Sequence, residues 1–260
     1  MISIVIPTYN SEKSIEKLCE TIVNDVKIKF EIILINDAST DKTEDIINNL
    51  KLKYNFIRVL NLNYNIGQVG STLVGIDLAD GDFIVTMDDD LQHHPKFINN
   101  LYAEIKKLDV DVIVAKWKQD ETIIRNLSSY IFSVFSSILI LKKLNFRNTA
   151  YRIIKKEIKS DFVDFFISRF WIDPRRLRVK VSQINVFHNQ QTFRPYSSFK
   201  FRLLLALKHF LLDSYLIQIL IFILGSSRIL TSAFFAILFY ALQNFLKERV
   251  KAKRLHQMKK

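Results

Sequence analysis

The chain has 260 residues, of which 49% are hydrophobic and 25% are charged, a composition that excludes an intrinsically disordered polymer and allows a buried core. The single cysteine, Cys19, excludes an intramolecular disulfide and favours a reducing compartment. Residues 1–115 carry 11 basic and 18 acidic residues (net −7), and residues 116–260 carry 27 and 8 (net +19). This asymmetry predicts an anionic partner for the second half, either a membrane surface or a nucleic acid.

The N-terminal half alternates strand patterns with helix patterns. Apolar runs predict strands at residues 2–6, 30–35, 56–60, 83–86 and 111–115. Helical spacing appears at residues 14–26, 71–79 and 98–108 and around Ile46, Ile47 and Leu50, with a loop at 63–70. Cys19 falls in the first helix and is expected in the core. Strands that alternate with helices indicate an α/β fold with a mostly parallel sheet and flanking helices.

Three adjacent aspartates, residues 88–90, follow the predicted strand 83–86 directly. Ligands of open α/β sheets bind at the carboxyl ends of the strands. Adjacent carboxylates repel one another, and Mg²⁺ or Mn²⁺ would hold them together. In an extended segment Asp88, Asp90 and Gln92 point to one side, so these three are the expected metal ligands. The alternative is a solvated acidic turn before a helix N-terminus.

Residues 87–98, Met-Asp-Asp-Asp-Leu-Gln-His-His-Pro-Lys-Phe-Ile, resemble the Asp-x-Asp block of family 2 glycosyltransferases. The likeness is to the branch of dolichyl-phosphate mannose synthases and bacterial polyprenyl-phosphate glycosyltransferases. Asp89 replaces the usual small middle residue. The resemblance implies a GT-A fold, substrate contacts from Asp88 and Asp89, and a catalytic role for Asp90, where a divalent ion would neutralise the leaving diphosphate.

Further motifs of the same family follow at other predicted strand ends. The opening nucleotide-binding motif is matched at Pro7, Thr8, Tyr9 and Asn10, and residues 36–41 resemble the family's Asp-Asp-Gly-Ser-Thr-Asp motif. The resemblance implies that Asp37 contacts the nucleotide base, with Ser39 also in the substrate site. Asn65 and Gly67 match an Asn-x-Gly loop that can face phosphates. The alternative for residues 37–41 is an ordinary helix N-cap formed by Ser39 or Thr40.

The acceptor side rests on scattered basic residues. Arg125 and Ser129 fit the family's Arg-x-x-x-Ser spacing, and Arg152 matches its Gly-Phe-Arg-Leu-type segment without the glycine. The resemblance implies that Arg125 and Arg152 hold a lipid phosphate and belong to the catalytic set with Asp90. Residues 186–191 and 196–200 resemble the stretches before the membrane, where Gln191 replaces a more usual arginine and predicts altered acceptor specificity.

The C-terminal end is apolar and ends in a basic tail. Residues 201–212 read as an amphipathic interfacial helix, and apolar runs follow at 211–224 and 229–246. A full span needs about 20 residues, so these runs of 14 and 18 residues predict a tilted or re-entrant hairpin, or else a buried helical pair in a soluble protein. The tail, residues 247–260, has seven basic residues and one acidic residue and is expected in the cytosol. The first residues already read as a strand, without a signal-peptide pattern, so we expect the protein at the cytoplasmic face of a membrane.

The expected activity is metal-dependent, inverting transfer of a sugar from a nucleotide-diphosphate sugar to a polyprenyl phosphate. We expect a nucleotide-sugar half (1–115), an acceptor half (116–200), a membrane segment (201–246) and the basic tail (247–260).

A first alternative is extension of a polysaccharide at a hydroxyl, with Asp161 or Asp164 as the base. A second is a non-enzymatic, membrane-tethered nucleotide- or nucleic-acid-binding protein. It is disfavoured because the aromatic residues concentrate in apolar runs, so no nucleic-acid partner is expected. The sequence neither predicts nor excludes the formation of a homo-oligomer.

Overall fold

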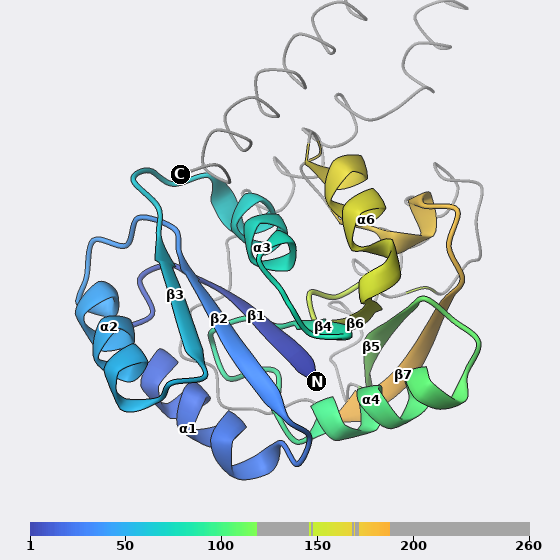
Figure 1. Cartoon of the computed structure of the whole chain (residues 1–260), viewed down its shortest axis with the longest axis horizontal. Helices are drawn as coiled ribbons and strands as arrows, with labels where there is room; N and C mark the ends of the chain where they lie inside the picture. Colours follow the sequence, from blue (N-terminus) through green and yellow to red (C-terminus); the bar gives the residue numbers. More distant parts are fainter. Residues whose placement is uncertain (119–145, 147, 168, 170–171, 188–260) are drawn as a thin grey trace, which may run out of the picture.

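A seven-stranded sheet runs through the computed structural model, which describes residues 1–118, 146, 148–167, 169 and 172–187 (Figure 1). The strands are β1 (Ile2–Thr8), β2 (Phe30–Asn36), β3 (Ile57–Asn61), β4 (Phe83–Thr86), β5 (Val112–Lys118), β6 (Arg152–Lys155) and β7 (Val181–Phe187). The helices are α1 (Ile15–Asp25), α2 (Thr43–Lys53), α3 (Gly67–Asp77), α4 (Phe97–Lys107) and α6 (Lys159–Phe166), with short 3₁₀ turns η1 (Lys156–Ile158) and η2 (Pro174–Arg176).

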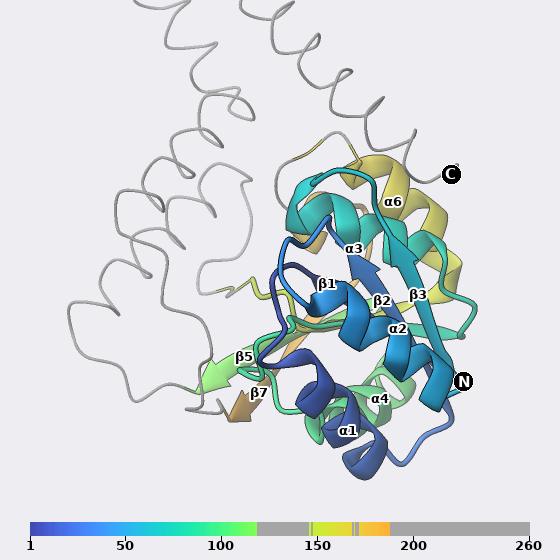
Figure 2. The same ribbon diagram turned by 90° about the vertical axis from the view of Figure 1, so that its left-hand side faces the viewer.

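The sheet separates two hydrophobic cores, because successive side chains of a strand point to opposite faces. Ile4 and Ile6 of β1 pack in one core with the apolar faces of α1, α2 and α4. Val5 packs in the other core with α3 and α6. Figures 1 and 2 show the same layering, with α1, α2 and α4 on one face of the sheet and α3 and α6 on the other. Strands buried on both faces explain why their sequences are continuously apolar.

The strand order, β3-β2-β1-β4-β6-β5-β7, places the first and fourth strands side by side. The chain leaves β1 toward β2 on one side, whereas β4 continues the sheet on the other side. All neighbours pair in parallel except β6, which is antiparallel to both β4 and β5. The carboxyl ends of β1 and β4 therefore border the crevice at which open α/β sheets bind ligands.

The α/β architecture and the five predicted strands are confirmed, and Cys19 is fully buried in the core as expected. Burial raises the pKa of the Cys19 thiol to about 12, so it is not a reactive group. The predicted start of the third helix is wrong, because α3 begins at Gly67 and not at residue 71. β6, α6 and β7 were not predicted as elements.

The predicted membrane segment and basic tail, residues 201–260, lie outside the described residues. Within the part of the chain that the structure describes, no helix combines the length and apolar character that a membrane crossing requires.

The edge of the sheet opposite the crevice is held by one buried carboxylate. Glu31 is 8% exposed, and its oxygens accept hydrogen bonds from Ser3 Oγ (2.5 Å), the Asp80 N–H (3.0 Å) and Arg58 Nη1 (3.0 Å). Burial by itself raises the pKa of Glu31, but the hydrogen bonds lower it by more than burial raises it. The pKa therefore lies below its ordinary value of 4.5. Ionised Glu31 thus joins β1, β2, β3 and the turn that precedes β4.

We expect Glu31→Gln to lower the free energy of unfolding at pH 7 by about 2 kcal/mol, because the charge-assisted hydrogen bonds are lost. A lowered folded-state pKa gives stability that is present above about pH 4.5 and is lost as the pH falls through the folded pKa. Urea denaturation between pH 7 and pH 3 should therefore show a weaker pH dependence in the variant. Glu20→Gln, which removes an exposed ion pair with Lys53, is the matched control. Equal pH dependence in Glu31→Gln and wild-type protein would contradict this role.

Candidate functional site

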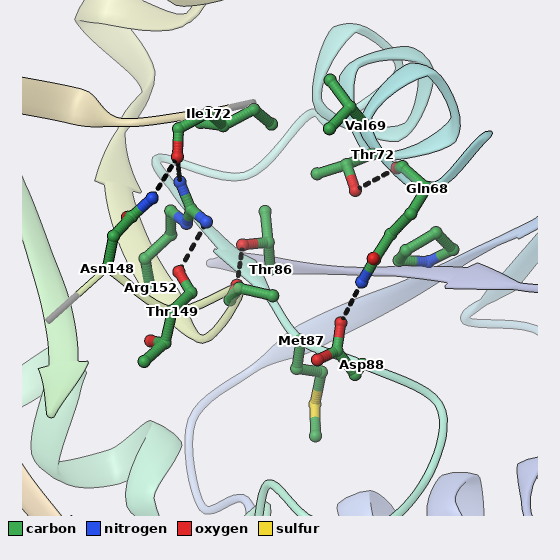
Figure 3. A pocket seen from close by; sticks show the side chains of 12 residues that line it. Gln68, Val69, Thr72, Thr86, Met87, Asp88, Asn148, Thr149, Arg152 and Ile172 are labelled. Atoms are coloured by element: carbon green, nitrogen blue, oxygen red, sulfur yellow. Dashed lines mark hydrogen bonds between the residues drawn. The ribbon is translucent and has the colours of Figure 1, made fainter. Parts of the chain in front are cut away.

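A cavity of about 180 Å³ opens at the carboxyl end of β4, against the first turns of α3. Figure 3 shows its wall on one side from α3, on the other from the segment that leads into β6, and between them the end of β4. The lining residues are Pro7, Gln68, Val69, Thr72, Thr86, Met87, Asp88, Asn148, Thr149, Ala150, Arg152 and Ile172. The three aspartates therefore start at the mouth of a pocket, as their place after a strand predicted.

Asp88 lines the cavity and is held from two sides. Its Oδ1 accepts a hydrogen bond from Gln68 Nε2 at 2.5 Å (Figure 3). Its backbone N–H donates to His93 Nδ1 at 3.1 Å, and His93 Nε2 lies 3.8 Å from Asp88 Oδ2. His93 is 5% exposed and stacks on the buried ring of Tyr151, with centroids 5.1 Å apart. The orientation of Asp88 is thus fixed by α3 and by a packed imidazole.

Asp89 turns away from the cavity and into the protein. It is 3% exposed, and its Oδ2 accepts hydrogen bonds from the Tyr9 N–H (3.2 Å) and from Ser11 Oγ. The middle aspartate therefore contacts the loop after β1. Asp89 is too buried for the alternative of a solvated acidic turn before a helix N-terminus, whereas Asp88 and Asp90 are partly exposed and α4 begins at Phe97.

Asp90 pairs with Gln92. Asp90 Oδ1 accepts the Gln92 N–H (3.1 Å), and Oδ2 lies 2.7 Å from Gln92 Nε2. The premise of an extended segment is wrong, because β4 ends at Thr86 and Leu91 adopts a left-handed conformation with φ of 61°. The turn nevertheless places the Gln92 amide at the Asp90 carboxylate, so rotation of that amide would present its oxygen beside a carboxylate oxygen.

The predicted metal ligands fit Mg²⁺ or Mn²⁺ by their chemistry, since Asp88, Asp90 and Gln92 offer only hard oxygen donors to a cation. Among the described residues no group of three or more histidine, cysteine, aspartate or glutamate side chains is suited to hold a metal ion. A set of two carboxylates and one amide suits magnesium, which keeps several waters and binds substrate phosphates as well.

The first predicted nucleotide motif surrounds the end of β1. Pro7 lines the cavity, whereas Thr8 turns into the sheet and donates to the Ile35 carbonyl at 3.1 Å. Tyr9 is 41% exposed and offers an aromatic surface at the crevice. Pro7 and Tyr9 are therefore accessible to a ligand, and Thr8 has a structural contact.

The loops after β1 and β2 are joined by hydrogen bonds. Asn10 donates its N–H to Ser39 Oγ (3.0 Å), and its Oδ1 accepts from the Thr40 N–H (2.8 Å). Neither Ser39 nor Thr40 caps α2, because the N–H of Thr43, the first helical residue, donates to Asp41 Oδ1 at 3.0 Å. The capping alternative thus named the wrong residues.

Asp37 holds the start of α3. It is 3% exposed, and its two oxygens accept the N–H groups of Ile66 (2.7 Å) and Gly67 (2.9 Å). Asn65 Nδ2 in turn donates to the Asp37 carbonyl at 3.1 Å. These contacts, together with Gly67 at φ of 83°, start the helix earlier than its sequence pattern suggested.

The described residues with positive φ all lie in the loops that border the crevice. They are Asn10 after β1, Ala38 after β2, Gly67 at the start of α3 and Leu91 after β4. Non-glycine residues adopt this region at an energetic cost and concentrate at functional sites. The distribution of strained backbone therefore marks the same place as the cavity.

Arg152 lies at the inner wall of the cavity. It is 6% exposed, and its guanidinium donates to the carbonyls of Thr149 and Ile172. Burial lowers the pKa of Arg152 to about 10, against the opposing effect of Asp173 and Asp88, so it stays charged at neutral pH. Arg125 and Ser129, and the later Gln191, lie outside the described residues.

Two cavity residues, Gln68 and Asn148, and the neighbouring His93 were not predicted to have a role. Gln68 fell in the predicted loop, but it stands on the first turn of α3 and reaches Asp88. His93 was part of the quoted block without a role of its own, and Asn148 donates to the Ile172 carbonyl at 2.6 Å beside Arg152. Sequence spacing offers no signal for the contacts of Gln68 and Asn148, since they join residues 20 and 24 positions apart, whereas His93 lies five residues after Asp88.

Asp161 and Asp164, the bases considered for a hydroxyl acceptor, are both exposed on α6. Neither lines the cavity. α6 buries Phe162, Val163 and Phe166 against the core that it shares with α3, so its acidic residues face outward.

The sequence profile described as Glycosyl transferase family 2 matches residues 3–204. Among curated proteins, dodecaprenyl-phosphate galacturonate synthase of Rhizobium johnstonii is 33% identical over 137 residues, which are 50% of this chain and 40% of the relative. Undecaprenyl-phosphate 4-deoxy-4-formamido-L-arabinose transferase of Proteus mirabilis is 35% identical over 106 residues, 39% of this chain and 32% of the relative. The chain thus matches less than half the length of these relatives.

Two solved structures share the fold. TarS of S. aureus (residues 1–349, in complex with UDP-GlcNAc) aligns with a TM-score of 0.51 and 19% identity, covering 82% of this chain and 67% of TarS. Glucosyl-3-phosphoglycerate synthase of Mycobacterium tuberculosis, in complex with Mn²⁺, UDP and phosphoglyceric acid, aligns with a TM-score of 0.53 and 18% identity, covering 75% and 72%. The fold is accordingly an α/β fold of the GT-A type.

We expect Asp37→Ala to lower the free energy of unfolding by about 1–3 kcal/mol, because the Ile66 N–H loses its acceptor, whereas the Gly67 N–H also donates to Asn65 Oδ1 at 3.1 Å. Because the start of α3 and the β2 loop border the crevice, nucleotide affinity should fall at least fivefold. Asp37→Asn keeps one acceptor oxygen and should give an intermediate result. Urea denaturation and calorimetric titration with UDP, GDP and dTDP measure both effects. An Asp37→Ala protein with unchanged stability and affinity would refute both roles.

Proposed function

Since the chain belongs to glycosyl transferase family 2, we propose that this glycosyltransferase moves a sugar from a nucleotide-diphosphate sugar to a polyprenyl phosphate. We also propose that the reaction needs Mg²⁺ or Mn²⁺ and inverts the anomeric configuration. The observation that carries the proposal is the cavity at the carboxyl end of β4, which Asp88 and Arg152 both line.

The donor half of the proposal rests on the crevice between β1 and β4. The two structural neighbours hold UDP-GlcNAc, or UDP with Mn²⁺, on the same fold. In this chain the nucleotide would lie against Pro7, Tyr9 and the loop that contains Asp37. Asp88, Asp90 and Gln92 would hold the divalent cation, which supplies positive charge to the leaving diphosphate. The donor sugar would then extend toward the cavity.

The acceptor half rests on the relatives and on the position of Asp161 and Asp164, the two carboxylates considered as bases. Both named relatives are described as acting with polyprenyl phosphates. A phosphate acceptor is already ionised at neutral pH and needs no strong base, whereas a hydroxyl does. Asp161 and Asp164 are exposed and lie outside the cavity lining, which favours the phosphate acceptor. Arg152 supplies buried positive charge at the cavity, and Arg125 is proposed as its partner for the lipid phosphate.

We further propose that the protein works at the cytoplasmic face of a membrane, with residues 1–115 for the donor, 116–200 for the acceptor and 201–246 for the bilayer. The net charge of +19 over residues 116–260 supports this arrangement, since anionic headgroups attract basic residues by about 1 kcal/mol each. Dolichyl and undecaprenyl phosphates are the candidate acceptors.

The decisive experiment assays the detergent-solubilised full chain with undecaprenyl phosphate, dolichyl phosphate and free oligosaccharides as acceptors. Each acceptor is tested with a panel of UDP-, GDP- and dTDP-sugars. The proposal expects a lipid-phosphate-linked sugar from one donor and no product with the oligosaccharides. Transfer to a saccharide hydroxyl alone would replace it with the polysaccharide alternative. If no combination of donor and acceptor gives a product, the proposed transfer to a polyprenyl phosphate is not supported.

Asp90→Ala is expected to reduce transfer by about 100-fold or more, because the cation that faces the diphosphate loses a carboxylate ligand. Asp45→Ala, on the exposed face of α2, is the matched control and should keep wild-type activity. Calorimetric titration with Mn²⁺ in the presence of the nucleoside diphosphate gives a readout that does not depend on turnover. Undiminished transfer in excess chelator would count against a metal-dependent reaction.

Truncation after Lys200 should yield a protein that binds the donor nucleotide but transfers poorly to a long polyprenyl phosphate, because residues 201–246 are the proposed membrane contact. The full chain should sediment with membranes, resist extraction by high salt and dissolve in detergent. Fractionation followed by immunoblotting measures this directly. The membrane assignment is wrong if the full chain stays in solution without detergent or if the truncated protein transfers as well as wild type.

A further inference from the structure

Asp89 has a different environment from the aspartates on either side of it. Asp88 contacts Gln68 at the cavity, and Asp90 contacts Gln92. Asp89 is 3% exposed and accepts hydrogen bonds from the Tyr9 N–H at 3.2 Å and from Ser11 Oγ, two groups of the β1 loop. Turning this carboxylate to a cation would break its hydrogen bonds to the buried Ser11 hydroxyl and to the partly buried Tyr9 N–H, which also donates to Ser11 Oγ at 3.3 Å, and that loss is costly. Its chemistry is therefore that of a fixed acceptor.

The contact of Asp89 is one link in a closed series of hydrogen bonds around the crevice. From Asp89 the series passes to the β1 loop, where Asn10 bonds to Ser39 and Thr40 of the β2 loop. From the β2 loop, Asp37 bonds to the N–H groups that start α3. On the first turn of α3, Gln68 returns to the aspartate turn through Asp88 (Figure 3). The aspartate turn is thus tied to the nucleotide loops at two points.

The two hydrogen-bonded links, Gln68 to Asp88 and Asp89 to the β1 loop, hold different parts of the site in place. The link through Gln68 ends on Asp88, a side chain that lines the cavity. The link through Asp89 ends on the backbone of Tyr9 and on Ser11, which is 3% exposed, so it fixes the course of the β1 loop. Asn10, between these two residues, adopts φ of 51°, a conformation that the surrounding contacts must maintain.

We propose that Asp89 is a positioning residue that couples divalent-cation binding at the aspartate turn to nucleotide binding at the β1 and β2 loops. This inference rests on the proposed function, because it assumes that the cation and the nucleotide bind at these two places. A cation that binds Asp88 and Asp90 requires one conformation of the turn, and in that conformation Asp89 orders the Tyr9–Ser11 segment. Each ligand thereby prepares the site of the other, and the effect is reciprocal.

The test measures coupling and not activity. Nucleoside diphosphate affinity is determined by calorimetry on the detergent-solubilised full chain, without metal and with saturating Mn²⁺, and the ratio of the two Kd values is the coupling factor. UDP, GDP and dTDP are the probes, and the tightest binder is used throughout. The variants are Asp89→Ala, Asp89→Asn, Ser11→Ala and the double variant of Asp89→Ala with Ser11→Ala.

Wild-type protein is expected to show a coupling factor of at least ten, within the usual range for coupled sites. Asp89→Ala should reduce it at least threefold, with metal-free affinity changed less than threefold, and the coupling that remains is the direct attraction between the cation and the diphosphate. Asp89→Asn and Ser11→Ala should lie between, since each leaves one of the two contacts to the β1 loop. The double variant should resemble Asp89→Ala, because both substitutions remove the same contact.

Glu12→Ala is the matched control. Its carboxylate belongs to the same loop but accepts from the Lys42 N–H at 3.2 Å and does not reach the aspartate turn, so the coupling factor should stay at the wild-type value. Ser11→Ala removes only a hydroxyl and keeps the test valid if Asp89→Ala does not fold.

Wild-type coupling in folded Asp89→Ala and Ser11→Ala would overturn the positioning role and leave the proposed function intact. A wild-type nucleotide affinity that Mn²⁺ does not change would overturn it as well, even in an enzyme that transfers sugar. Wild-type protein that binds none of the three nucleotides would overturn both the positioning role and the proposed function.

Discussion

Three carboxylates in succession at the end of a buried strand are the constraint on which this site depends. Like charges a few ångströms apart repel strongly where water is partly excluded. The turn after β4 reduces the conflict by giving each aspartate its own surroundings: an amide from α3 for Asp88, the β1 loop for Asp89 and the Gln92 amide for Asp90. A left-handed residue, Leu91, is part of that solution, since it turns the chain directly after the three aspartates.

The fold supplies the partners that this turn requires. Because β1 and β4 are neighbours in the sheet, the loop after β1 lies beside the aspartates although 80 residues separate Tyr9 from Asp89. β2 borders β1 on the other side and brings Asp37 to the start of α3. A parallel sheet collects all these loops at one edge, which is why strained backbone, buried carboxylates and the cavity occur together there.

The site and the opposite edge of the sheet use buried carboxylates for different purposes. Glu31 joins three strands and the turn before β4 with full hydrogen bonding and lies far from the cavity in the topology of the sheet. Asp37 and Asp89 are as well buried, but they hold loops at the ligand edge. The chemistry of a buried carboxylate is thus the same at both edges, and its position in the sheet decides whether it supports the fold or the site.

The sequence by itself determined the α/β class of the fold and the strand ends that carry the polar motifs. Continuous apolar runs specify strands buried on both faces, and polar motifs at the ends of those strands mark the ligand edge, because both signals depend only on neighbouring residues. The family is also readable from the order of these motifs, and the profile match over residues 3–204 agrees. Tertiary structure decided what local patterns cannot contain. The early start of α3 depends on Asp37, some 30 residues away, and the antiparallel insertion of β6 depends on pairing with β4 and β5. The inward direction of Asp89 depends on Ser11, because a carboxylate in a turn takes the direction of the donors that the rest of the fold brings to it.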